Sequence, residues 1–317
     1  MTVLVSGKNG QLGKELQAIA SYNKDNRFIF FDKDELNIAD NASLQTTFQK
    51  YSPSFFINCA AYTAVDKAET EQEKAYLVNA EAVSNIAKHC HRFKTKLVHI
   101  STDYVFDGKA TQPYKEDDKT DPVNYYGYTK WLGEQLALNN NPGTIVIRTS
   151  WVYSTYGNNF VKTMLRLMKE RKEINVVNDQ LGSPTYAKDL AEAIVEIVNR
   201  HSSIVKRQSS NVNRELSNVN LQSAIGNLQS QEIYPSPLAS HVYHFSNDGI
   251  ISWYDFAVAI KEIKQLDCIV NPIPTTAYPT PAKRPAYSVF DKTKIKSTFN
   301  IQLKNWKKSL EECLNKL

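Results

Sequence analysis

The feature that most constrains the fold is a regular alternation, over the first 150 residues, of short apolar runs with longer segments of helical period. The segments expected to form helices are residues 11–20, 41–51, 65–90 and 125–138. The runs expected to form strands are residues 2–6, 28–31, 54–60, 96–101 and 144–150. These runs are apolar throughout, which is typical of parallel strands covered by helices on both faces. The pattern predicts an α/β protein with a Rossmann-like, doubly wound parallel sheet.

The alternation becomes irregular after residue 150, which predicts a second, smaller α/β domain for binding the substrate. We expect the first domain to span residues 1–150 and the second to take up most of 151–317. Segments near 185–203 and 241–250 are expected to return to the first domain.

Two stretches lack the pattern of either helices or strands. Residues 205–240 are rich in Ser, Asn and Gln and are interpreted as a flexible insertion. The proline-rich run 271–285 is expected to be a loop, because proline fits neither a helix interior nor a central strand.

The overall composition excludes several classes of protein. The net charge of +5 is spread along the chain, so we expect no nucleic-acid partner. No run approaches the roughly 18 apolar residues of a membrane span, and the chain begins directly with an apolar strand, so we expect neither membrane insertion nor export. Four cysteines lie far apart without metal-ligand spacing, which predicts reduced thiols, no metal site and a cytoplasmic location.

Three glycines, Gly7, Gly10 and Gly13, follow the first expected strand and open the first expected helix. A helix start offers free backbone N–H groups and the positive end of the helix dipole, and a missing Cβ lets a pyrophosphate come close. The next strand ends in Asp32, the position at which such folds bind the adenosine ribose. The first domain is therefore predicted to bind NAD(P).

Asp32 also bears on the choice of nicotinamide cofactor. A carboxylate accepts hydrogen bonds from a ribose 2′-hydroxyl and repels a 2′-phosphate, which favours NADH. Lys8 and Lys33 lie close enough in sequence to offset this repulsion, so the prediction is NADPH or NADH. Ala61 and Thr63, after the third strand, would let the cofactor lie flat, although buried packing at a strand end explains them nearly as well.

A hydroxyl residue and a Tyr-x-x-x-Lys pattern indicate the chemistry. Thr102 follows the fourth strand and so lies at the same edge of the sheet as the glycines. Tyr126 stands four residues before Lys130, and side chains four apart share one face of a helix. Hydride delivery to a ketone creates an alkoxide, which Tyr126 would protonate while Thr102 holds the carbonyl oxygen. The Lys130 ammonium is expected to lower the pKa of Tyr126 and to hold the nicotinamide ribose.

Together these residues resemble the extended short-chain dehydrogenase/reductases, which share the glycine turn and the Tyr/Lys pair. More narrowly, the chain is similar to the dTDP-4-dehydrorhamnose reductase family nearly from end to end. The segments that carry this resemblance are "GKNGQLG", "AAYTAVDKAE", "STDYVFDG", "YYGYTK", "RTSWVY", "NNFVKTMLRL", "NDQLGSPT" and "TTAYPTPAKRP". The resemblance implies reduction of the C4 ketone of dTDP-4-dehydro-L-rhamnose by NAD(P)H. This is the last step of dTDP-L-rhamnose biosynthesis, which supplies polysaccharide biosynthesis.

Carried over position by position, the resemblance implies three groups of site residues. The catalytic residues would be Thr102, Tyr126 and Lys130. The sugar nucleotide would contact Thr102, Asp103, Tyr104 and Trp151, to which we add Arg284 as our own prediction for a diphosphate contact, with an ordinary surface arginine as the equal alternative. The dinucleotide would contact Gly7, Gly10, Gln11, Leu12, Gly13, Asp32, Asn37, Ile38, Ala61, Tyr62, Thr63, Tyr126 and Lys130.

Two departures from the family pattern matter. Some members use glutamates to hold a magnesium ion between subunits, and here Glu15 matches one such position while Lys188 occupies another. Mg²⁺ therefore stays a weak alternative, no metal ligand is predicted, and the expected state is a monomer or a homodimer. The insertion at 205–240 falls outside every motif, so it should not abolish activity.

Two other functions remain open. A sugar-nucleotide epimerase or dehydratase of the same fold would keep its NAD bound, and Asp103 sustains this alternative because dehydratases of the superfamily carry an acid beside the hydroxyl residue. A non-catalytic binding protein resembling the regulatory subunit of methionine adenosyltransferase is the other. The intact Thr102, Tyr126 and Lys130 weigh against it.

Overall fold

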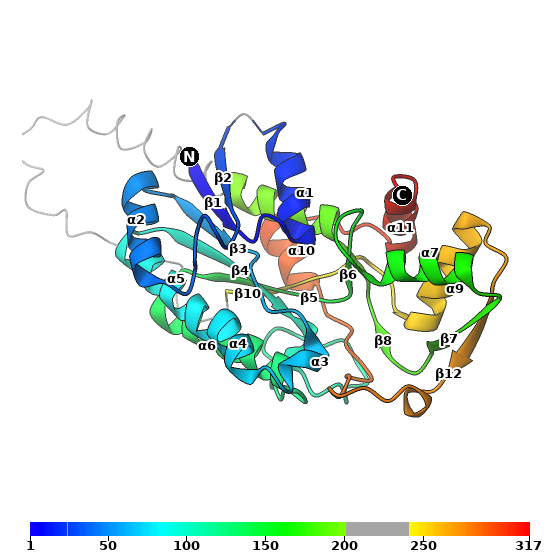
Figure 1. Ribbon diagram of the computed structural model, residues 1–317. Helices are drawn as coiled ribbons and strands as arrows, with labels where there is room; N and C mark the ends of the chain where they lie inside the picture. Colours follow the sequence, from blue (N-terminus) through cyan, green and yellow to red (C-terminus); the bar gives the residue numbers. More distant parts are fainter. Residues whose placement is uncertain (24, 201–240) are drawn as a thin grey trace, which may run out of the picture.

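The computed structural model describes residues 1–23, 25–200 and 241–317, so the insertion expected at 205–240 lies outside the described residues. A parallel six-stranded sheet in the order β10-β5-β4-β3-β1-β2 forms the centre of the fold (Figure 1). Its strands are β1 (Thr2–Ser6), β2 (Arg27–Phe31), β3 (Phe55–Asn58), β4 (Lys96–Thr102), β5 (Ile145–Thr149) and β10 (Val242–Phe245). The predicted α/β class and parallel sheet are confirmed.

Alternate side chains of each strand point to opposite faces of the sheet. Both faces are apolar, and helices cover each of them. Val3 and Val5 enter one hydrophobic cluster, and Leu4 enters the other. The helices packed on the first face are α1 (Gln11–Ala20), the helix at residues 187–200 and α10 (Thr293–Phe299) (Figure 1). Those on the second face are α2 (Asn41–Tyr51), α5 (Ala82–Arg92) and α6 (Tyr125–Asn140).

The order of the strands reverses between β1 and β3, because the chain places β2 on one side of β1 and β3 on the other. Ligands of such sheets bind at the carboxyl edge beside this switch point. Gly7 follows β1 with φ +77°, and a Cβ there would lie 2.7 Å from the backbone nitrogen of Ala60. The ends of β1 and β3 therefore approach each other in a way that only glycine permits.

The single helix predicted over residues 65–90 is wrong. The segment forms α3 (Val65–Ala68), α4 (Gln72–Tyr76), a π-helical turn (Leu77–Glu81) and α5. In this turn, fully buried Asn79 accepts from the Tyr62 N–H (2.9 Å) and donates through Nδ2 to the Tyr62 carbonyl (3.0 Å) and to Thr129 Oγ1 (3.1 Å). The extra residue of a π turn thus places an amide between the loop after β3 and α6.

A further hydrophobic cluster lies beside the sheet, and we call the elements around it the second lobe. These elements are β6 (Val152–Tyr153), α7 (Phe160–Glu170), β7 (Glu173–Val177), β8 (Leu181–Gly182), β9 (Thr185–Tyr186), β11 (Ile251–Ser252), α9 (Trp253–Lys264), β12 (Ile269–Ile273) and α11 (Trp306–Leu314). Their strands pair as β11-β8, β12-β7 and β6-β9, and Figure 1 shows β12 beside β7.

The proline-rich run 271–285 is not a loop throughout, contrary to our expectation. Its first residues belong to β12, where Pro272 stands opposite Val176, and a short 3₁₀ turn follows at Thr275–Ala277. A two-stranded ribbon tolerates this proline because each of its strands is an edge strand.

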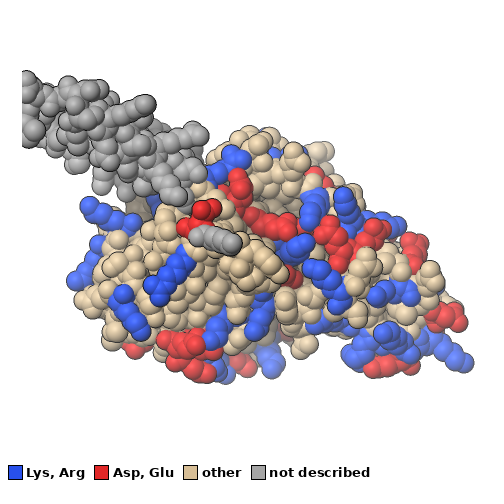
Figure 2. All heavy atoms as spheres, turned by 90° about the horizontal axis from the view of Figure 1, so that it is seen from above, with Lys and Arg blue, Asp and Glu red and all other residues tan. Residues whose placement is uncertain are grey.

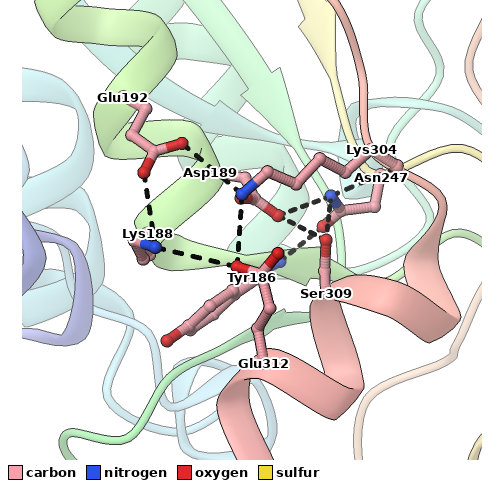
Figure 3. A network of polar contacts seen from close by, with 8 residues as sticks. All are labelled: Tyr186, Lys188, Asp189, Glu192, Asn247, Lys304, Ser309 and Glu312. Carbon is pink, nitrogen blue, oxygen red and sulfur yellow. Dashed lines mark hydrogen bonds and ion pairs between the residues drawn. The ribbon is translucent and has the colours of Figure 1, made fainter.

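A polar network, which we call the interlobe network, joins the helix at 187–200 to α11 and to the segments beside them (Figure 3). Asp189 accepts from Asn247 Nδ2 (2.8 Å) and from the Ser309 hydroxyl, and its other oxygen lies 2.8 Å from Lys304 Nζ. Asn247 in turn accepts from the Tyr186 N–H (2.8 Å). The network joins the six-stranded sheet and its covering helices, which we call the sheet-bearing part, to the second lobe. Most of the groups that form it are buried.

The surface carries both signs of charge. On the face seen in Figure 2, Lys and Arg side chains are scattered and Asp and Glu side chains lie among them. Within the described ranges, no helix combines the length and the apolar character needed to span a membrane.

Candidate active site

The glycine turn leaves the start of α1 accessible. Gly10 is the N-cap, and no side-chain cap hydrogen bond forms there. A Cβ on Gly10 would contact only the Gly7 carbonyl oxygen, at 3.4 Å, whereas a Cβ on Gly13 would lie 2.2 Å from that oxygen. Gly7 and Gly13 therefore serve close packing, and Gly10 leaves room beside the backbone N–H groups of Gln11 and Leu12. This arrangement fits the pyrophosphate of a dinucleotide.

The side chain of Gln11 links α1 to the second lobe. Its Nε2 donates to the Val152 carbonyl (3.4 Å), and its Oε1 accepts from Asn159 Nδ2 (2.9 Å). The predicted pyrophosphate turn is therefore tied to β6 and to the cap of α7.

Asp32, at the end of β2, is paired with Lys8 in the glycine turn. Lys8 Nζ lies 3.2 Å from Asp32 Oδ2 and also bonds Glu35. The hydrogen bond from Lys8 holds the pKa of Asp32 below its usual range, and the N–H groups of Asp34 and Glu35 act in the same direction. A cation therefore stands beside the carboxylate that would repel a 2′-phosphate, as predicted for Lys8.

The other predicted dinucleotide residues lie in two loops. Asn37 and Ile38 stand between β2 and α2, where Asn37 Oδ1 accepts from the Ala39 N–H (3.1 Å). Ala61, Tyr62 and Thr63 follow β3, and Asn79 fixes the backbone of Tyr62 from both sides. Sequence reasoning missed Asn79, because only the π turn brings it to this loop.

Thr102, Tyr126 and Lys130 meet at the carboxyl end of β4. Thr102 ends the strand, and Tyr126 and Lys130 lie one turn apart on α6; all three are buried. The Tyr126 hydroxyl lies close enough to Thr102 to affect the pKa of Tyr126, and Lys130 Nζ donates to the Ile100 carbonyl (2.6 Å). The predicted constellation is thus assembled in space.

Local packing explains how α6 delivers these side chains. Asn124 caps the helix by accepting from the Gly127 N–H (2.8 Å). A Cβ on Gly127 would lie 2.2 Å from the Tyr104 carbonyl oxygen, so this glycine lets the first turn of α6 press against the turn after β4. The Tyr104 ring then meets the Tyr126 ring edge to face, with centroids 5.6 Å apart.

Burial governs the protonation of Tyr126 and Lys130. It raises the pKa of Tyr126 to about 12, although the nearby Thr102 hydroxyl acts in the opposite direction. It lowers the pKa of Lys130 to about 8, against the attraction of Glu134. We expected Lys130 to lower the pKa of Tyr126, but its ammonium bonds Ile100 and burial dominates. A tyrosine that keeps its proton at neutral pH can act as an acid.

Asp103 extends the constellation toward the second lobe. Its Oδ1 accepts from Thr102 Oγ1 (3.0 Å), and its Oδ2 is buried without a hydrogen-bond partner in the described part of the chain. Burial raises the pKa of Asp103 to about 6, while the nearby Ser288 hydroxyl and the hydrogen bond from Thr102 oppose the shift. Ser288 was missed, because no pattern in "RPAYSVF" marks it. The orphaned oxygen fits an acceptor for a sugar hydroxyl.

Trp151 follows β5 and lies close to Ser288, the neighbour of Asp103. A Cβ on Gly182 would lie 2.7 Å from the Trp151 ring and 2.9 Å from Ser288 Oγ. The Trp151 indole also stacks on Trp253, with centroids 3.6 Å apart and planes 12° apart. Trp151, Gly182, Ser288 and Asp103 therefore form a continuous row.

The Arg284 side chain forms an ion pair with the sheet-bearing part. Its Nη2 donates to Asp66 Oδ2 (2.8 Å), and its Nη1 donates to the Ala282 carbonyl (2.8 Å). The same segment is held where Asn124 Nδ2 donates to the Lys283 carbonyl (2.8 Å). A diphosphate contact by Arg284 stays a prediction, and it would require exchange with Asp66.

Glu15 and Lys188, the two positions compared above with a magnesium site of the family, both contact other protein side chains. Glu15 is buried and accepts from the Ser154 hydroxyl (2.6 Å), while Lys188 Nζ lies 3.5 Å from Glu192 and 3.7 Å from Glu312. Among residues 1–23, 25–200 and 241–317, no group of three or more His, Cys, Asp or Glu side chains is arranged to hold a metal ion.

Comparisons with known proteins cover the whole chain. The family model described as RmlD substrate binding domain matches residues 1–212 and 214–317. A spore coat polysaccharide biosynthesis protein of Bacillus subtilis is 40% identical, over 98% of this chain and 96% of its own length. The dTDP-4-dehydrorhamnose reductase of Escherichia coli K12 is 37% identical, over 100% of this chain and 98% of its own.

Solved structures agree with the fold. A dTDP-4-dehydrorhamnose reductase from Bacillus anthracis, solved with NADP, superposes with a TM-score of 0.84 at 36% identity and covers 100% of this chain and 99% of its own. The UDP-glucose 4-epimerase of Thermus thermophilus, solved with NAD, has a TM-score of 0.73 at 16% identity, so it shares the fold alone; it covers 100% of this chain and 98% of its own.

Proposed function

We propose that the chain, which belongs to the dTDP-4-dehydrorhamnose reductase family of the extended short-chain dehydrogenase/reductases, reduces the C4 ketone of dTDP-4-dehydro-L-rhamnose to give dTDP-L-rhamnose. NADPH or NADH is the reductant. The observation that carries the proposal is the buried cluster of Thr102, Tyr126 and Lys130 beside the uncapped start of α1.

Cys59 connects the two halves of this site. A Cβ on Gly7 would lie 2.8 Å from the carbonyl carbon of Cys59, and the Cys59 thiol is close enough to Lys130 for each to shift the other's pKa. The glycine turn and the acid are therefore near neighbours across the end of β3. We propose that the sheet-bearing part binds the dinucleotide and that the second lobe binds the sugar nucleotide.

Each residue of the cluster has a distinct role in this proposal. When bound, the nicotinamide supplies the hydride that reduces C4. Thr102 donates a hydrogen bond to the C4 oxygen, and Tyr126 donates its proton to that oxygen as negative charge develops there. Lys130 holds the ribose hydroxyls. The transfer of one hydride and one proton converts the ketone to an alcohol.

Asp103, Tyr104 and Trp151 would bind the sugar. Thr102 donates to Asp103 in this structure, so it must turn from Asp103 toward the ketone. A sugar hydroxyl can then donate to Asp103 in its place. Arg284 would bind the diphosphate after leaving Asp66, because a guanidinium pairs with two phosphate oxygens at once.

The cellular setting follows from the thiols and the substrate. All four cysteines, Cys59, Cys90, Cys268 and Cys313, are free thiols. We therefore propose a cytoplasmic enzyme, since this compartment keeps thiols reduced. A monomer or a homodimer remains our prediction for its assembly.

The test follows the absorbance of NADPH and of NADH with enzymatically generated dTDP-4-dehydro-L-rhamnose. We expect oxidation by the wild type and a loss of roughly 10²- to 10⁴-fold in kcat for Tyr126→Phe, with cofactor affinity nearly unchanged. Tyr128→Phe, on the same helix but 42% exposed, is the matched control and should keep full activity. Folded wild type that oxidises neither cofactor, or Tyr126→Phe with normal turnover, would contradict the proposal.

A second candidate rests on Asp103. An acid beside Thr102 suits an epimerase or dehydratase that returns its hydride. Such an enzyme keeps NAD bound through purification, so the protein would carry stoichiometric cofactor and would turn over a sugar nucleotide without added NAD(P)H. A reductase must release the oxidised cofactor in each cycle.

A further inference from the structure

We propose that Trp253 is a positioning residue for the sugar nucleotide, which acts by holding the Trp151 indole in place. The inference rests on the proposed function and deepens it, because it names the residue that fixes Trp151 in the proposed substrate site. Nothing in the sequence pattern marked Trp253, which belongs to the second lobe and lies far from Trp151 along the chain.

The Trp151 backbone alone does not fix this residue. Trp151 has φ +49°, in the left-handed region that non-glycine residues seldom adopt. Such a conformation is strained and persists only where the surroundings hold it. Part of this support comes from the Trp151 carbonyl, which accepts from the Thr185 N–H (3.2 Å).

The Trp151 ring is held by two neighbours. On one side lies Gly182, which has no room for a Cβ against the ring carbons. The Trp253 indole covers a ring face at 3.6 Å and 12°. Stacked aromatic pairs contribute about 0.5–1.5 kcal/mol beyond the area that they bury. The ring is therefore fixed next to Ser288, a neighbour of the predicted sugar ligand Asp103.

Trp253 is itself built into a rigid position. It is the first residue of α9, and the capping box of Ser252 and Asp255 fixes this helix start: the Asp255 N–H donates to Ser252 Oγ (3.0 Å) and the Ser252 N–H donates to Asp255 Oδ2 (2.9 Å). Phe160, the first residue of α7, packs against the Trp253 ring with centroids 4.6 Å apart. The second lobe thus presents one indole as a firm support for the other.

The consequence is specific to the sugar nucleotide. Loss of the stack frees Trp151 to leave the row that it forms with Ser288 and Asp103, while the dinucleotide turn around Gly10 is untouched. We expect Trp253→Ala to raise the KM for the sugar nucleotide roughly 3- to 10-fold, which corresponds to the energy of one aromatic pair. The KM for NADPH should stay within about twofold.

The experiment compares Trp253→Ala, Trp253→Phe and Trp253→Leu with Trp306→Phe in steady-state kinetics against both substrates. Trp253→Phe should retain most of the affinity because it keeps a planar ring, whereas Trp253→Leu fills the space without stacking and should behave like Ala. Trp306→Phe is the matched control, since Trp306 belongs to the same cluster but packs against Phe256 and Gly249. Circular dichroism should show that the coupled-indole band disappears in every Trp253 variant and persists in Trp306→Phe.

The outcomes separate the two proposals. An active wild type with an unchanged sugar-nucleotide KM in Trp253→Leu, once the coupled band is gone, overturns the positioning role and leaves the reductase intact. Equal losses for both substrates, or no rescue by Trp253→Phe, mean a general structural role and also overturn it. A folded wild type without reductase activity overturns both proposals.

Discussion

Asp103 makes the stability of the protein depend on pH at the level of one residue. Burial raises its pKa from 3.8 to about 6, so the native state resists ionisation more than the unfolded chain does. Well below pH 3.8 the carboxyl is protonated in both states and costs nothing. As the pH rises toward 6 the unfolded chain ionises first, and above pH 6 the full cost, about 3 kcal/mol, is present.

We therefore predict that Asp103→Asn is more stable than the wild type at pH 7.5 and close to it at pH 4. The gain in unfolding free energy should grow to about 1–3 kcal/mol across this range. Urea unfolding at both pH values measures it. Asp107→Asn is the control, since backbone and side-chain hydrogen bonds lower the pKa of Asp107 and its replacement should give no such gain. A gain that is equal at both pH values would contradict the linkage.

At this scale the sequence predicted the residues whose spacing is local. Tyr126 and Lys130 share a helix face, and Thr102 ends a recognisable strand, so their meeting followed from periodicity and from the rule for parallel sheets. Ser288 and Trp253 could not be found in this way. They reach the site from distant segments through side-chain packing that leaves no local pattern.

The N-terminal turn of α1 is the element whose glycines can be separated by function. Gly10 has φ −73°, so alanine fits its backbone, and a Cβ there meets a single atom at 3.4 Å. At Gly13 a Cβ would instead lie 2.2 Å from the Gly7 carbonyl oxygen and 2.8 Å from Lys8 Cα. Both contacts are with backbone that must shift.

We predict that Gly10→Ala folds with a stability within about 1 kcal/mol of the wild type but binds NADPH more weakly, because the methyl group occupies the approach of the pyrophosphate. Gly13→Ala should lose about 1–3 kcal/mol of unfolding free energy through overpacking. Urea unfolding and fluorescence titration with NADPH measure the two effects. Unaltered NADPH affinity in Gly10→Ala would place the pyrophosphate elsewhere.

Elements with their own signals were predicted well. The bounds of α1 and α2 agree with the expected residues 11–20 and 41–51. The division of segment 65–90 into shorter helices was not predicted, because it depends on tertiary contacts. Asn79 bonds Tyr62 and Thr129 only when the loop after β3 and α6 are already in place.

Across the whole molecule, Lys304 is the lysine of the interlobe network that contacts the buried Asp189 carboxylate. Its Nζ lies 2.8 Å from Asp189, 3.2 Å from Glu312 and 3.7 Å from Glu192 (Figure 3). The Asp189 side chain is only 5% exposed, whereas the other two carboxylates are partly solvated. Removing the lysine leaves a buried carboxylate without its nearest positive charge.

We predict that Lys304→Met lowers the unfolding free energy by about 1–3 kcal/mol, less than for a fully buried pair because Lys304 is 32% exposed. Lys307→Met is the control, since Lys307 lies 3.6 Å from Glu262 and both side chains are about half exposed or more. This second change should stay within about 1 kcal/mol of the wild type. Equal losses of unfolding free energy for the two variants in urea would show that the network contributes no more to stability than an exposed ion pair does.

At this largest scale the fold class followed from the alternation of elements, but the arrangement of the chain did not. The apolar runs predicted strands without saying which would be neighbours. The pairing of β12 with β7 and the contact of Arg284 with Asp66 depend on side chains far apart in sequence.

The pairing of β10 with β5 also sets an order of assembly during protein synthesis. Val242 stands beside Val146, so the edge of β5 stays open until residues 242–245 have left the ribosome. By then β6, β7, β8 and β9 have already been made. The nascent sheet therefore cannot be completed before the first part of the second lobe has been made, and a chain interrupted before residue 241 would expose an apolar strand edge prone to aggregation.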